Sequence, residues 1–170
     1  MNRRLIDSPV ISRIRRNHGL EHATIHLLSR AKPRRQLAGH SDANGFWLVG
    51  DVDTDELAEV ASEALARLRN GERELAVHPN CGTNFATYGT FAGIGAFAAF
   101  AGAGEKFRHK LERLPLAALF ATLALILAQP IAFRLQREVT TSGDPEGLKI
   151  MTITRTTVGG RTAHRVLTEG

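Results

Sequence analysis

Residues 114–133 have the sequence LPLAALFATLALILAQPIAF, which is strongly apolar and carries no charged side chain. Residues 85–104, FATYGTFAGIGAFAAFAGAG, form a second uncharged run that is less apolar and rich in alanine and glycine. Twenty helical residues extend about 30 Å, the thickness of the hydrocarbon core of a bilayer. A buried hairpin of a water-soluble protein is the alternative, but a chain of 170 residues has too small a core to enclose two such helices. The two runs therefore predict a transmembrane helical hairpin.

The first run also contains Gly89-x-x-x-Gly93, a spacing that lets a second helix approach closely within a bilayer. This helix face is the expected contact for a protein partner or for a second copy of the chain. The lipid bilayer is the other expected partner.

The segments on both sides of the hairpin predict one small mixed α+β domain. Apolar residues recur at helical spacing after Ser8-Pro9 and again after Asp53, which predicts helices over residues 9–31 and 54–69. Asn44-Gly45 predicts a hairpin turn, and Gly159-Gly160 predicts a second one. The strands expected around these turns are residues 37–40, 46–49, 74–78, 148–157 and 161–167.

The sequence therefore predicts an α+β fold with two helices, about three strands and a C-terminal β-hairpin that completes the sheet. The domain boundaries follow: residues 1–82 for the soluble part with a histidine-rich helix, 83–135 for the transmembrane hairpin, and 136–170 for the terminal β-hairpin.

Charge and composition indicate which side of a membrane the domain faces and which class of partner is not expected. The formal net charge is +5, and one tryptophan and one tyrosine supply few aromatic platforms, so we expect no nucleic-acid partner. Basic residues number six on the domain side of the hairpin and four in its loop, which favours a cytoplasmic domain on a cell-membrane protein with two spans. The six are Arg67, Arg69, Arg73, Arg134, Arg137 and Lys149, and the four are Lys106, Arg108, Lys110 and Arg113.

Residues 17–26, NHGLEHATIH, contain the side chains best suited to bind a metal ion and to catalyse a reaction. His18 and His22 lie one helical turn apart on one face, so both imidazoles can reach one metal ion, and Glu21 borders that face. The spacing His-x-x-Glu-His is that of metallopeptidases in which the glutamate activates a metal-bound water. His26 extends the row but lies about 12 Å along the axis from His18, so a straight helix offers either His18 with His22 or His22 with His26.

A third ligand is expected from the turn before the first uncharged run. His78 and Cys81 are spaced His-x-x-Cys around Pro79, and a cysteine binds as thiolate. Four ligands (His18, His22, His78 and Cys81) make a closed structural site, whereas three leave a position for water and catalysis. The alternative is a set of hydrogen-bonded histidines with no metal. His40, His109 and His164 have no such neighbours in the sequence and are expected in loops or at the surface.

Two motifs resemble those of the YqhQ-like bacterial membrane proteins and related families of unknown function. One is His-Gly-x-Glu-His-x-Thr-Ile-His, matched by residues 18–26, and the other is His-Pro-x-Cys-Gly-Thr, matched by residues 78–83. Leu135-Gln136 and Thr140-Thr141 are similar to a third, with slightly different spacing. The resemblance implies joint use of both motifs in a metal site, because members of these families are described as predicted metal-dependent enzymes.

The function expected from the sequence is that of an integral membrane protein with a His/Cys metal site. We expect a divalent ion of the Zn²⁺ class as cofactor and a metal-dependent hydrolase as the activity, with Glu21 as the catalytic base. A non-enzymatic membrane protein, whose structural metal site docks a partner, is the alternative.

Overall fold

The computed structural model describes residues 8–104 and 106–170. The first seven residues of the predicted domain 1–82 and Glu105 in the loop between the uncharged runs lie outside this description. The chain divides into two compact units. We call residues Met1–His78 with Arg137–Gly170 the α+β unit, and Pro79–Gln136 the hairpin unit.

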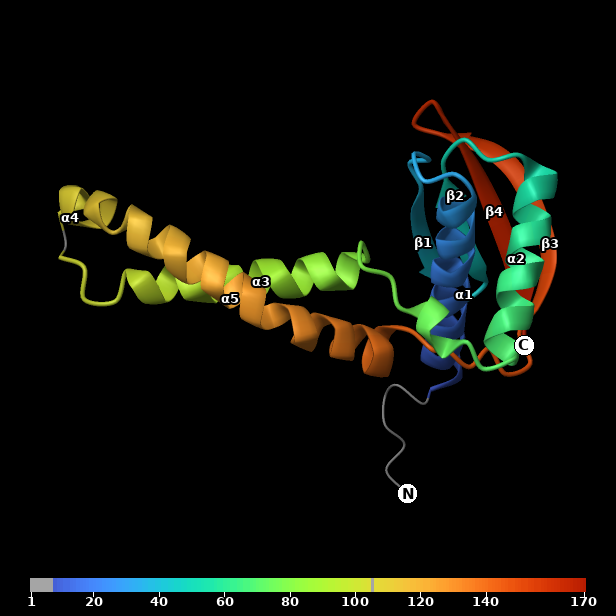
Figure 1. Ribbon diagram of the computed structural model, residues 1–170, viewed down its shortest axis with the longest axis horizontal. Coiled ribbons are helices and arrows are strands. Elements are labelled where there is room, and N and C mark those ends of the chain that lie inside the picture. The colour runs from blue at the N-terminus through green and yellow to red at the C-terminus, as the bar shows by residue number, and fades with distance from the viewer. Residues whose placement is uncertain (1–7, 105) are drawn as a thin grey trace, which may run out of the picture. The chain divides into compact units, whose positions relative to one another are not determined.

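The α+β unit places two helices against one face of a four-stranded antiparallel sheet (Figure 1). The helices are α1 (Pro9–Ala31) and α2 (Thr54–Arg69), and the strands are β1 (Ala38–Asp42), β2 (Gly45–Val49), β3 (Lys149–Val158) and β4 (Arg161–Glu169). The strand order is β1-β2-β4-β3, with Leu48 of β2 opposite His164 of β4. The predicted joining of the C-terminal hairpin to the N-terminal strands is thus confirmed.

Both helices begin where the sequence predicts a cap. The Ser8 side chain accepts a hydrogen bond from the Ile11 amide, and Pro9 occupies the first helical position, where its missing N–H costs nothing. The Asp53 carboxylate accepts hydrogen bonds from the amides of Asp55 and Glu56 at the start of α2. Each cap satisfies backbone donors that the helix itself leaves unpaired.

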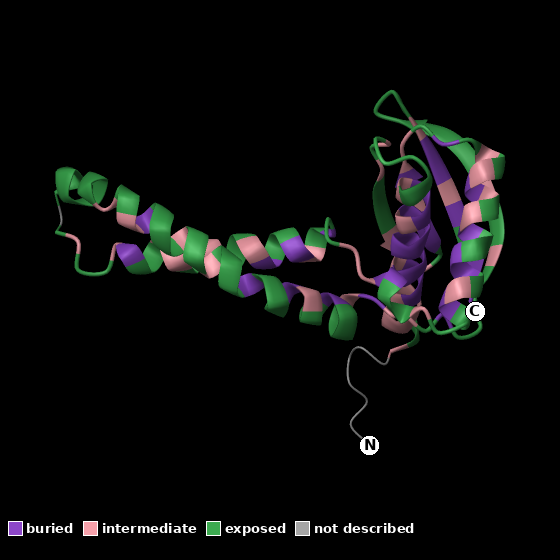
Figure 2. Ribbon diagram, in the orientation of Figure 1, coloured by how far each residue is buried: buried purple, intermediate pink, exposed green. Residues whose placement is uncertain are grey.

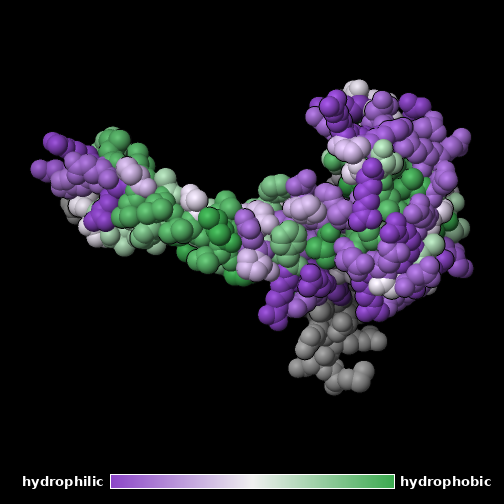
Figure 3. All heavy atoms as spheres, viewed as in Figure 1, coloured by the Kyte–Doolittle hydropathy of each residue, from purple (hydrophilic) through white to green (hydrophobic). Residues whose placement is uncertain are grey.

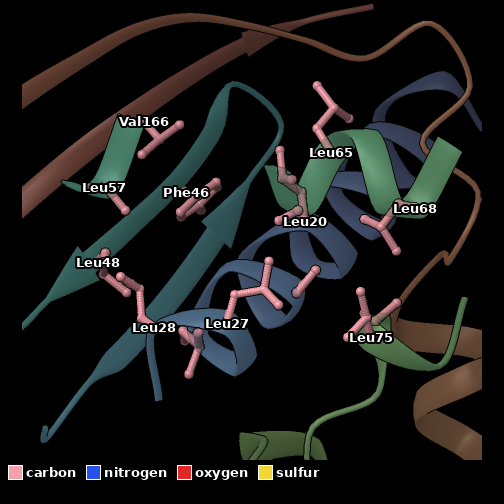
Figure 4. Close-up of a cluster of buried hydrophobic side chains, with 14 of the residues drawn as sticks. Leu20, Leu27, Leu28, Phe46, Leu48, Leu57, Leu65, Leu68, Leu75 and Val166 are labelled. Carbon is pink, nitrogen blue, oxygen red and sulfur yellow. The ribbon is translucent and has the colours of Figure 1, made fainter. Parts of the chain in front are cut away.

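The core lies between the helices and the sheet (Figure 4). Leu20 and Leu28 of α1, Phe46 and Leu48 of β2, and Leu57 of α2 are all fully buried. Burying one such side chain stabilises the fold by about 1.5–3 kcal/mol. Buried residues in Figure 2 concentrate on the inner faces of α1, α2 and the central strands. The helix α1, which contains three of the histidines, is therefore packed on the core.

One predicted strand is wrong. Residues 74–78 do not join the sheet; Arg73–Ala76 form a short 3₁₀-helix, η2. Leu75 and Ala76 are both buried, so the strand alternation of inward and outward side chains is missing. The carbonyl oxygens of Ala76 and Val77 bond to histidine rings of α1 instead of a neighbouring strand. The sheet therefore has two strands plus the terminal hairpin instead of about three plus the hairpin.

The hairpin unit contains α3 (Gly82–Ala99), α4 (Phe107–Glu112) and α5 (Leu114–Leu135), and α3 packs along α5. A Cβ atom on Gly95 of α3 would lie 2.6 Å from the carbonyl oxygen of Phe120, so glycine allows this close approach. Gly89 and Gly93, predicted as a contact face, have no described atom within 4 Å of such a Cβ.

The prediction of two membrane spans is corrected to one candidate. Within the described residues, one helix is long and apolar enough to cross a bilayer: the segment Leu114–Thr140, which comprises α5 and the π-helical turn η3 (Gln136–Thr140). Apolar side chains are exposed along this unit, as Figure 3 shows. α3 does not qualify, because glycine, threonine and Asn84 interrupt its apolar residues.

Candidate metal centre

Four histidine rings of the α+β unit form one cluster between α1 and the end of η2. The ring centroids of His18 and His22 lie 4.3 Å apart, those of His22 and His78 lie 5.6 Å apart, and those of His26 and His78 lie 4.6 Å apart. His22 is buried, and the other three are half-buried. The structure thus brings together the histidines of both motifs.

Backbone carbonyls orient the first two rings in the same way. The Nδ1 atom of His18 lies 2.9 Å from the carbonyl oxygen of Thr140, and that of His22 lies 2.8 Å from the carbonyl oxygen of Ala76. A carbonyl oxygen can only accept, so each Nδ1 carries a hydrogen, and in the neutral imidazole the lone pair is then on Nε2. Ligating histidines in metal sites are commonly fixed through such a hydrogen bond from the other ring nitrogen.

His26 has the opposite arrangement. Its Nε2 atom lies 2.8 Å from the carbonyl oxygen of Val77, so Nε2 is the donor and the lone pair is on Nδ1. The row of three histidines therefore splits by tautomer into the pair His18 and His22 and a differently oriented third ring. This favours His18 with His22 among the pairs that the sequence left open.

Burial, together with the neighbouring rings of His26 and His22, lowers the pKa of His78 to about 4. The imidazole is therefore neutral at neutral pH, which is the form that binds metals.

The Glu21 carboxylate is buried and points toward strand β1. It accepts a hydrogen bond of 2.5 Å from the Ser41 hydroxyl. Its oxygen and carbon atoms also lie against Gly39, where a Cβ atom would overlap them. The carboxylate predicted as the catalytic base is therefore directed at β1, and among the described residues it is not part of the candidate metal-binding group.

Cys81 is the N-cap residue of α3 and lies in the hairpin unit, three residues after His78 in the chain. Among the described residues, His18, His22 and Cys81 form a candidate His/Cys metal-binding group. The group contains imidazole and thiol donors, the ligand types that zinc prefers.

Several contributors to the cluster were missed from the sequence. The carbonyl groups of Thr140, Ala76 and Val77 carry no side-chain signal, since every residue has one. Gly39 and Ser41 are two residues apart in β1, so a strand places them on the same face. That they contact Glu21 could not be predicted from the sequence.

His164 was predicted at the surface or in a loop, and this is wrong. It lies in β4, a central strand, and is fully buried, with Nε2 3.1 Å from the Thr54 hydroxyl. Because sheet order decides which strand is central, the position of one histidine in a terminal hairpin gave no indication of its burial.

Comparison with known proteins places these features in a family context. A model of a domain of unknown function (DUF6391) matches residues 13–153. An uncharacterised protein of Picosynechococcus sp. is 35% identical over 144 residues, which cover 76% of this chain and 66% of the relative. The chain thus spans just under two thirds of that relative's length. No solved structure matches the chain. The matched family differs in name from the YqhQ-like proteins that the motifs resemble, and it shares with them an unknown function.

Proposed function

We propose that this chain, which belongs to the DUF6391 family of domains of unknown function, is a membrane protein whose α+β unit binds a divalent metal ion. His18, His22 and Cys81 are the proposed ligands, with His78 as the fourth. The ion is of the Zn²⁺ class, because neutral imidazoles and a thiolate together suit zinc. The observation that carries the proposal is the shared orientation of His18 and His22, whose Nε2 lone pairs are fixed by two backbone carbonyls.

Chain connectivity supports the part assigned to Cys81. Pro79 and Asn80 form a turn, and the Cα atoms that flank a β-turn lie within about 7 Å of each other. The Asn84 side chain donates a hydrogen bond of 3.0 Å to the Pro79 carbonyl oxygen, which braces the turn against the first turn of α3. The thiol is therefore tethered close to His78, whose ring belongs to the histidine cluster.

Metal analysis of the purified full chain in detergent tests this proposal. We expect about one metal ion per chain in the wild type and a loss of that ion in His22→Ala. His109→Ala is the matched control, because it removes an exposed histidine of α4, and it should keep the ion. A metal-free wild-type protein that binds no added Zn²⁺ or Co²⁺ contradicts the proposal.

Cobalt substitution tests the thiolate separately. A Co²⁺-loaded wild-type protein should show a thiolate-to-metal charge-transfer band, and Cys81→Ser should lose the band while it keeps metal. If the wild type shows no such band, Cys81 is not a ligand and the site consists of histidines.

The activity that we propose is metal-dependent hydrolysis, in which Glu21 takes the proton of the attacking water. The support for this assignment is the His-x-x-Glu-His spacing of residues 18–22; the Glu21 carboxylate itself is held against Ser41 of β1. Glu21→Gln keeps the shape of the side chain, so it should retain the metal and lose hydrolysis of any ester or peptide substrate that the wild type cleaves. If Glu21→Gln loses the metal instead, Glu21 is a ligand.

A structural metal site that docks a protein partner is the second candidate. It is favoured by the number of donors, since His18, His22, His78 and Cys81 together would fill the four positions of a tetrahedral ion. Water relaxation measured on a paramagnetic ion in the site separates the two candidates. A bound water that exchanges with solvent supports hydrolysis, and its absence supports the closed site.

For the membrane, we propose that the segment Leu114–Thr140 spans the bilayer and that the α+β unit faces the cytoplasm. Because strands before and after this segment pair in one sheet, the chain has to cross twice, and α3, which packs along α5, is the proposed second crossing. The apolar length of the segment supports the span, and the distribution of lysine and arginine supports the orientation. Labelling of single cysteines placed in the loop residues 106–113 and in β3, in intact cells of a Cys81→Ser background, tests both. Equal access to both positions from outside contradicts the span.

A further inference from the structure

A large cavity of the α+β unit lies away from the histidine cluster, at the end of α1. It has a volume of about 1160 Å³ and is lined by the C-terminal residues of α1, the start of β1, the end of β2 and the start of β4. Lys32 follows α1 ten residues after His22, which is about 15 Å along a helix axis. The cavity is therefore a separate feature of the unit, and the proposed metal centre does not use it.

Positive side chains dominate the cavity. Lys32, Arg34, Arg35 and Arg161 line it, whereas Asp51 is its one acidic lining residue. Glu56 lies behind this wall and pairs with Arg35 and Lys32. Four positive groups thus face two negative ones, and the excess of two matches the charge of a phosphate monoester at neutral pH, about −1.5 to −2.

The cation of Arg35 is already fixed in place. Its side chain is 10% exposed, and two of its N–H groups donate to the two carboxylate oxygens of Glu56, each at 3.0 Å. A guanidinium has five N–H donors, so this bidentate pair leaves donors for a further anion. A ligand that binds here does not have to order this side chain.

Arg34 and Arg161 are the cations that a ligand can recruit. Both are exposed, and no ion pair joins either of them to a described acidic group. They come from different elements, since Arg34 follows α1 and Arg161 begins β4. Their convergence on one cavity is a product of the fold.

The floor of the cavity is apolar. Leu37 and Val49 are half-buried lining residues, next to Pro33 and Ala38. Gly50 brings these segments together: its φ is +153°, and a Cβ atom there would lie 2.6 Å from the Leu37 side chain and 2.7 Å from the Gln36 carbonyl oxygen. An apolar floor beneath a basic rim fits a ligand with an anionic head and an apolar part.

From these observations we propose that the cavity binds a phosphate monoester group, with Arg34, Arg161 and Lys32 on the phosphate and Leu37 and Val49 against the rest of the ligand. The phosphate can belong to a membrane lipid or to a soluble metabolite, and the chemistry of recognition is the same. The site adds a second ligand to the chain and does not depend on the metal centre.

Equilibrium binding to the full chain in non-ionic detergent tests the proposal with three probes: glycerol phosphate, dihexanoyl phosphatidic acid and dihexanoyl phosphatidylcholine. Both phosphate monoesters should bind, and the double variant Arg34→Gln with Arg161→Gln should weaken binding by about tenfold or more, since two charge-assisted contacts are lost. Tighter binding of phosphatidic acid identifies a lipid as the source, and equal binding of both monoesters identifies a soluble phosphate.

Two control variants separate this site from a general attraction of anions. Arg155→Gln removes an exposed arginine of β3 outside the cavity and should leave binding unchanged. Ala38→Trp fills the floor, keeps every charge and should weaken phosphatidic acid more than glycerol phosphate. The proposal is overturned if neither monoester binds, if Arg155→Gln weakens binding as much as the double variant, or if phosphatidylcholine binds as tightly as phosphatidic acid.

Discussion

The Nδ1 atom of His22 lies 2.8 Å from the carbonyl oxygen of Ala76, a residue 54 positions later in the chain. This contact decides which ring nitrogen keeps a lone pair, because the carbonyl can only accept. It also accounts for the missing strand at residues 74–78: the Ala76 carbonyl, which a neighbouring strand would otherwise bind, is bonded to the His22 ring. The chemistry of the first motif thus depends on the backbone conformation just before the second motif.

The tautomers predict different consequences for neighbouring histidines of the same helix. His18→Ala removes a ring with the same orientation as His22 and should reduce metal content to near zero. His26→Ala removes a ring whose Nε2 is engaged by Val77 and should keep the ion at wild-type stoichiometry. Metal analysis after dialysis against a weak chelator measures both. If His26→Ala loses the ion and His18→Ala keeps it, the ligand pair is His22 with His26.

Much of the α+β unit could be predicted from periodicity and capping. Helix α2 is confirmed at Thr54–Arg69 and α1 at Pro9–Ala31, because apolar spacing and caps are local signals. The failures were not local. Burial of His164 depends on the order of the strands, and the packing face of α3 depends on the position of α5. The row of histidines could be recognised from its spacing. The carbonyls that orient the rings could not, because every residue has a carbonyl group.

Gly39→Ala should destabilise the α+β unit by about 1–3 kcal/mol, because the new side chain would overpack against a buried neighbour. The added Cβ would overlap the Glu21 carboxylate, which the Ser41 hydroxyl holds in place. Chemical denaturation followed by tryptophan fluorescence reports it, because Trp47 lies in the same sheet. Gly147→Ala is the control, since a Cβ there has no described atom within 4 Å, and it should stay within about 0.5 kcal/mol of wild type. Equal effects of the two substitutions would show that Glu21 moves away without cost.

The buried His164 predicts a loss of stability in acid. Burial lowers its pKa below 6.5, and the positive charge of Arg155 acts in the same direction, while Asp53 opposes it. As the pH falls below about 6.5, the unfolded chain takes up a proton that the folded chain resists, so the free energy of unfolding decreases. At higher pH the neutral ring of the folded state is fully favoured and this contribution is constant.

His164→Gln removes this titration and keeps a polar group near Thr54. The free energy of unfolding of this variant should fall less than that of the wild type between about pH 7 and pH 5. The lowered pKa of His78 contributes in both proteins and cancels in the difference. Denaturation curves at several pH values in metal-free buffer measure the two slopes, and parallel slopes would mean that His164 is protonated without penalty.

Glycines of α3 predict where the hairpin unit is tightly packed. Gly95→Leu places a side chain against the Phe120 carbonyl oxygen and the Ala124 side chain, and it should destabilise the packing of α3 on α5 by about 1–3 kcal/mol. Gly93→Leu gains the same helix propensity but enters space that no described atom occupies. Unfolding of both variants in mixed micelles of increasing denaturing detergent gives the comparison. If Gly93→Leu is as harmful as Gly95→Leu, the face of Gly89 and Gly93 is covered by another helix in the assembled protein, and the contact with a partner or a second copy that the sequence predicts gains direct support.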